Sequence, residues 1–153
     1  MTAADVAGFL ATALVAGLLG GGAMEVTMWL ITRSGWAKGN MIIALGSLFT
    51  GSRGSAWRVG LVLHAVSAVV FAIGYTLLML ALHLNTLPGS LALGLGVGFV
   101  HGMLVSLMLV WVVAERHPLR EFQEADLAIG LSHLAGHVAF GGTVGLVVGL
   151  AAL

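Results

Sequence analysis

The sequence contains no cysteine and few charged residues. Without cysteine there can be no disulfide framework and no thiolate metal site, so any metal ligand has to be histidine, glutamate, aspartate or methionine. Basic and acidic residues number six each, and this balance favours neither nucleic acid nor an acidic partner. A Gly-rich phosphate loop and a Ser-His-Asp arrangement are also missing from the sequence. An enzyme of the soluble kind is therefore not expected.

Hydrophobic residues make up 59% of the chain and charged residues only 8%, a composition that indicates a membrane protein. Each of four apolar stretches exceeds the roughly 20 residues that cross about 30 Å of hydrocarbon. They run near 5–32, 59–83, 89–114 and 127–152. The first is too long for a signal-peptide core and has no basic residue before it, so we expect a retained helix. We predict an all-α fold: one transmembrane domain over 1–153 that forms a four-helix bundle.

All six basic residues fall in two of the three connections between these spans. They are Arg33, Lys38, Arg53 and Arg58 between the first two spans, and Arg116 and Arg120 between the last two. By the positive-inside rule both connections are cytoplasmic, which puts the two termini and the LNTLPG turn on the outer side.

The first of these connections contains NMIIALGSLFTG, residues 40–51, which is apolar but too short to span. We expect an interfacial or re-entrant helix there. In the other connection, Glu121, Glu124 and Asp126 precede the fourth span. Acidic residues at that place are typical of a helix start.

Glycines recur at four-residue spacing in three of the spans. They are Gly17 and Gly21, Gly98 and Gly102, and Gly141, Gly145 and Gly149. Such ridges let membrane helices approach closely. They predict a tight bundle, formed within the chain or shared with partner subunits or further copies.

Several ionisable residues lie at membrane depth. Counted inward from the cytoplasmic ends, Glu25, His64 and His133 are eight, six and seven residues inside Arg33, Arg58 and Asp126, at depths of about 9 to 12 Å. His137 lies one turn deeper on the same helix face as His133. His101 lies near the middle of the third span.

A charged group in hydrocarbon costs at least about 2.5 to 3.5 kcal/mol, so these five residues should face inward and satisfy one another. Neutral imidazoles with one carboxylate suit a transition metal such as Zn, Cu or Fe. We therefore predict a metal site formed by Glu25, His64, His101, His137 and His133. The sequence does not indicate which of these ions binds.

Three other interpretations stay open. The same residues could form a metal-free, hydrogen-bonded core that responds to protons. The chain could be a structural accessory subunit that docks through its glycine ridges. Haem could be held between His64 and His133, although Glu25 in the same layer would be poorly placed beside a porphyrin. His83 and His117, near span ends, are interpreted as ordinary interfacial residues.

Four local patterns, AMEVTMWLITR, LHAVSAVVFAIGY, FVHGMLVSLM and SHLAGHVAF, resemble those of the YagU-like family of small bacterial inner-membrane proteins. The resemblance implies a four-span bundle in the cytoplasmic membrane, with Glu25, His64, His101 and His137 as a recurring polar set. It also implies a link to acid tolerance and longer loops than this chain has. His133 is not part of this pattern, and its inclusion rests on spacing alone.

Overall fold

The computed structural model describes residues 2–37, 40–124 and 126–151, and every regular element in these ranges is helical. The elements are α1 (Ala3–Arg33), α2 (Met41–Thr50), α3 (Arg53–Ala81), α4 (Gly89–Met108), a π-helical turn η1 (Leu109–Val113), α5 (Ala114–Arg116), a 3₁₀ turn η2 (Arg120–Phe122) and α6 (Leu127–Ala151). Four helical segments are long and apolar enough to cross a membrane. The predicted all-α, four-span architecture is confirmed. Lys38 and position 152 of the predicted fourth span lie outside the described residues.

Short polar side chains start these helices. Thr2 and Asp5 form a capping box at α1, and Asn40 Oδ1 accepts the Ile43 N–H at the start of α2. Asp126 Oδ1 accepts the Ile129 N–H at the start of α6, which agrees with the helix start expected there. Such caps satisfy backbone donors that have no partner within the helix. At the far end of α2, Gly51 has φ +64°, a left-handed conformation in which glycine stops a helix without strain.

Two spans differ from their predicted limits. α3 begins at Arg53 rather than near residue 59, because hydropathy detects the apolar part of a helix and not the polar turn that precedes it. The third span continues beyond α4 through η1 and α5 to Arg116. His117 then becomes extended, as a residue before proline prefers.

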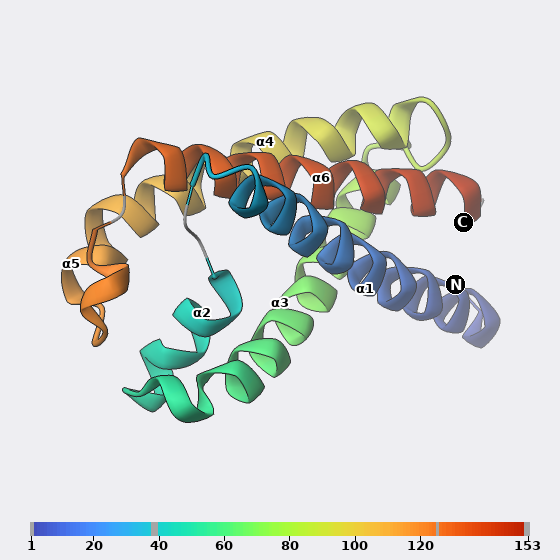
Figure 1. Cartoon of the computed structure of the whole chain (residues 1–153). Helices are drawn as coiled ribbons and strands as arrows, with labels where there is room; N and C mark the ends of the chain where they lie inside the picture. Colours follow the sequence, from blue (N-terminus) through green and yellow to red (C-terminus); the bar gives the residue numbers. More distant parts are fainter. Residues whose placement is uncertain (1, 38–39, 125, 152–153) are drawn as a thin grey trace.

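The helices form two arms that α1 joins (Figure 1). α4 lies along α6, and this is the most extensive contact between helices, whereas α2 folds back along α3. α1 packs against both α3 and α6. Because α3 and α4 contact each other little, the arm made by α2 and α3 diverges from the arm made by α4 and α6 (Figure 1).

Glycine makes close contacts possible within each arm and between α1 and α3. A β-carbon at Gly94 would lie 2.2 Å from the Gly141 carbonyl oxygen, and one at Gly46 would lie 1.9 Å from the Ala56 carbonyl oxygen. A β-carbon at Gly17 would lie 2.7 Å from Val69 Cα. The predicted tight packing is therefore made between helices of the same chain. A partner subunit would have to use another surface.

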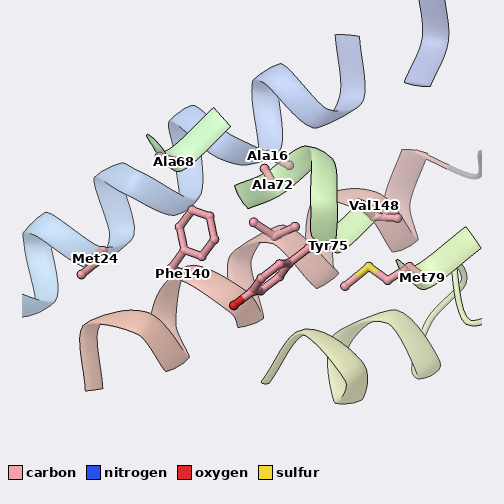
Figure 2. Close-up of a cluster of buried hydrophobic side chains, with 9 residues drawn as sticks. Ala16, Met24, Ala68, Ala72, Tyr75, Met79, Phe140 and Val148 are labelled. Carbon is pink, nitrogen blue, oxygen red and sulfur yellow. The ribbon is translucent and has the colours of Figure 1, made fainter. Parts of the chain in front are cut away.

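The buried core lies where α1, α3 and α6 meet (Figure 2). It consists of Ala16, Met24, Ala68, Ala72, Tyr75, Met79, Phe140, Val144 and Val148. Outside it, large apolar side chains such as Leu18, Val62 and Leu104 are more than half exposed. Apolar surface on this scale suits a lipid bilayer rather than water.

Candidate intramembrane binding site

A cavity of about 310 Å³ lies between the two arms. Its wall takes residues from α1, α2, α3, α4, η1 and α6, and most of that wall is apolar. Four of the five residues predicted as metal ligands line it: His64, His101, His133 and His137. A mostly apolar cavity with a few polar groups is the usual form of a ligand site.

Backbone contacts set the proton positions of two of these histidines. His133 Nδ1 lies 2.9 Å from the Ile129 carbonyl oxygen, and His137 Nδ1 lies 2.7 Å from the His133 carbonyl oxygen. A carbonyl oxygen only accepts hydrogen bonds, so each Nδ1 carries the proton and each neutral ring has its lone pair on Nε2. His133 Nε2 is buried and has no hydrogen-bond partner among the described residues.

Glu25 lies beside His64 rather than in the cavity wall. Its Oε1 atom is 2.8 Å from His64 Nδ1, and the two side chains are 34% and 13% exposed. The distance is that of an ion pair. Oε1 is also a second buried side-chain atom that makes no hydrogen bond in the described part of the chain. Glu25 also interacts electrostatically with His133 on α6.

His101 lies at the deep end of the cavity. Its Nδ1 atom is 3.1 Å from the Tyr75 hydroxyl oxygen. Its ring meets the ring of His137 edge-on at a centroid distance of 4.6 Å and is tilted against Phe71 at 4.2 Å. His101 thus joins α3 to α6 in the half of the bundle where the two arms come together.

Beyond Tyr75 most of the buried side chains are apolar, and the buried polar ones include Thr76 and Ser90. Ala72, Met79, Val144 and Val148 are each no more than 1% exposed and belong to one buried cluster; Figure 2 labels Ala72, Met79 and Val148. Side chains packed in this way leave no room for a chain of water molecules. The residues that line the cavity extend from Asn40 and Glu121, at the end of the bundle that carries α2 and α5, inward to His101 and Phe140.

His117 was expected to be an ordinary interfacial residue, and that interpretation is wrong. It is only 2% exposed, it lines the cavity, and its Nε2–H donates to the Ala44 carbonyl oxygen at 3.0 Å. Its Nδ1 accepts the Leu119 N–H at 3.1 Å. The local sequence has no signal for this role, because the role depends on α2 folding back along α3. His83 is exposed, as expected.

The side chains surround the cavity without converging on one point. Within residues 2–37, 40–124 and 126–151, no group of three or more histidine, aspartate or glutamate side chains has the spacing of a metal site. Binding of an ion would therefore require side-chain rotation into the cavity.

No protein-family model, curated protein or solved structure matches this chain. The resemblance to the YagU-like family stays a prediction, and the function has to be argued from the cavity itself.

Proposed function

We propose that this protein binds a transition metal ion in the intramembrane cavity, either alone or as a small subunit of a membrane complex. The observation that carries the proposal is the Nε2 atom of His133, which is buried against the cavity without a hydrogen-bond partner among the described residues. Leaving a buried polar atom unpaired costs about 1 to 3 kcal/mol. A bound ligand could supply the partner that His133 Nε2 lacks among the described residues.

The chemistry of the unpaired atoms limits that ligand. His133 Nε2 and Glu25 Oε1 both offer lone pairs, since the proton of His133 is on Nδ1. The missing partner must then be a cation or a hydrogen-bond donor. The carboxylate of Glu25 adds negative charge, which favours a cation.

The orientation of the histidines suits a metal. Histidine ligands usually donate the ring N–H that does not face the metal to a carbonyl or carboxylate oxygen, which holds the other nitrogen in place. His133 and His137 both do so. With His64 and Glu25 beside them, they offer the nitrogen and oxygen donors that Zn, Cu and Fe accept.

A second candidate function is a metal-free core that responds to pH. The contact between Glu25 and His64 favours it, because the two residues attract each other as an ion pair only when His64 is protonated. The close packing of Ala72, Met79 and Val144 beyond Tyr75 argues against a path that carries protons across the membrane. Such a core would instead change the packing of α1 against α3.

The positions of the arginines support a location and an orientation. Arg33, Arg53, Arg58, Arg116 and Arg120 all lie at the ends of helices that border α2 or α5. We therefore assign this end, where Asn40 and Glu121 line the cavity, to the cytoplasmic side of a bacterial inner membrane.

Metal content of the detergent-purified protein tests the proposal. We expect about one equivalent of a transition metal after reconstitution at neutral pH, and a higher melting temperature with the ion, since binding stabilises only the folded chain. His133→Ala and His137→Ala should each lose about tenfold or more in affinity.

His83→Asn is the matched control, because His83 is exposed and has φ +56°, a conformation that asparagine tolerates. It should bind metal as the original chain does. A wild-type protein that stays below about a tenth of an equivalent, with a melting temperature that no metal changes, would contradict the proposal.

A further inference from the structure

We infer that the ion is copper in its monovalent state, held by histidine nitrogens together with the thioether sulfurs of Met24 and Met41. This inference rests on the proposed metal site and names its ion. Three methionines, Met24, Met41 and Met108, line the same cavity as five histidines. A chain without cysteine has only thioethers as sulfur donors.

Met24 lies against the turn of α6 that contains Gly136, and it lines the cavity together with His133 and His137. It is 4% exposed, and its Cγ and Cε atoms are 3.1 and 3.5 Å from the point where a β-carbon of Gly136 would be. Gly136 is placed between His133 and His137 in the sequence of α6. In Figure 2, Met24 lies on α1 at one end of the buried cluster, next to Phe140. The absence of a side chain at Gly136 lets the thioether approach this turn of α6.

Met41 reaches the cavity from α2. It is the first residue of that helix, is partly buried and packs against the same cluster that contains Met24. Met108, in contrast, is 60% exposed and lies at the rim. The two inner methionines therefore face the cavity from α1 and α2, while His133 and His137 face it from α6.

Glu121 is the one carboxylate in the described cavity wall, whereas Glu25 lies outside that wall. Glu121 pairs with Arg53, and Asn40 Oδ1 accepts the Ile43 N–H that caps α2. Hard cations need such oxygens, whereas thioether and imidazole together suit monovalent copper. The donors that remain free to turn inward thus favour a soft ion over Zn or Fe.

An anaerobic competition assay tests this inference. The purified full-length chain is titrated with Cu(I) against a chromogenic Cu(I) chelator, and in parallel with Zn(II) against a zinc dye. We expect Met24→Leu and Met41→Leu each to weaken Cu(I) binding by about tenfold or more and to leave Zn(II) binding unchanged, since leucine keeps the volume but removes the sulfur. X-ray absorption at the copper edge should show sulfur in the copper shell of wild type and lose it in the double variant.

Two control variants separate ligation from packing. Met79→Leu changes a methionine of the buried core that does not line the cavity, and Met103→Leu changes an exposed methionine on α4. Both variants should bind Cu(I) as wild type does. Equal binding of Cu(I) by wild type and by the Met24 and Met41 variants would overturn the inference and leave the proposed metal site standing. Failure of wild type to bind either ion would overturn both.

Discussion

Glu25 Oε1 on α1 lies 2.8 Å from His64 Nδ1 on α3, and this contact connects two helices whose other contacts depend on small residues. Around Gly17, α1 approaches the α3 backbone closely, because a glycine there leaves room for Val69. Farther along α1, toward α2, the same pair of helices is joined by a carboxylate and an imidazole. The interface between α1 and α3 therefore has close packing around Gly17 and a polar contact at Glu25, farther along α1.

A double-mutant cycle measures the polar contact. Glu25→Ala, His64→Ala and the double variant should show a coupling free energy of about 0.5 to 3 kcal/mol, because removing either residue already removes the interaction. Chemical unfolding in detergent micelles provides the free energies of unfolding. Additive effects of the two substitutions, with no coupling, would show that the contact does not stabilise the bundle.

The contact between α4 and α6 depends on Gly94. We expect Gly94→Ala to lower the free energy of unfolding by about 1 to 3 kcal/mol, since the new methyl group would overlap the Gly141 carbonyl. Gly96→Ala is the matched control on the same helix, because a β-carbon there meets nothing within 4 Å. It should be neutral or stabilising by up to about 1 kcal/mol. Equal melting temperatures for the two variants would contradict this packing.

His117 holds α2 against the segment that follows α5. His117→Ala should cost about 1 to 3 kcal/mol, because it removes the hydrogen bond from Nε2 to the Ala44 carbonyl and leaves a cavity where the buried ring was. Amide hydrogen exchange should then rise in α2 and remain low in α6. The exposed His83→Asn variant should leave both unchanged. If the amide hydrogens of α2 exchange as slowly in His117→Ala as in wild type, other contacts hold this helix.

The absence of cysteine makes the orientation simple to measure. Ser52→Cys and Thr86→Cys place single thiols at exposed positions on opposite ends of α3. Thr86→Cys should react with a membrane-impermeant maleimide in intact cells, and Ser52→Cys should react only after lysis, as the arginine distribution requires. The opposite labelling pattern would invert the proposed topology.

Metal affinity should fall as the pH is lowered from about 7.5 to about 5.5, because ligand imidazoles must be neutral. The titratable groups at the site are Glu25 on α1, His64 on α3, His101 on α4, His133 and His137 on α6, and His117 and Glu121 in the segment between α5 and α6. Protonation of the imidazoles competes with the ion, so binding is strongest at the higher pH and is lost on acidification. Titration of the metal at several pH values measures the effect. A constant affinity over this range would argue against histidine ligands.

Much of the fold follows from local properties of the sequence. Spans could be located because a membrane requires about 20 apolar residues and tolerates few charges. Glu25, His64, His101, His133 and His137 stand out in the sequence for the same reason. The four-residue periodicity of glycine predicted close helix contacts, and Asp126 was placed at a helix start by its position alone.

Other features depend on which helices meet, and no local pattern records that. Folding of α2 along α3 decides the burial of His117, and the register of α4 on α6 decides that Gly94 faces Gly141 while Gly96 faces no other helix. The divergence of the two arms creates the cavity that the histidines line. Apolar length and helix caps act within a segment, so the sequence alone determined a four-span helical protein with polar residues at membrane depth. Contacts between segments far apart in the chain depend on how side-chain shapes fit together, and only the tertiary structure decided which polar atoms remain unpaired and where a ligand can enter.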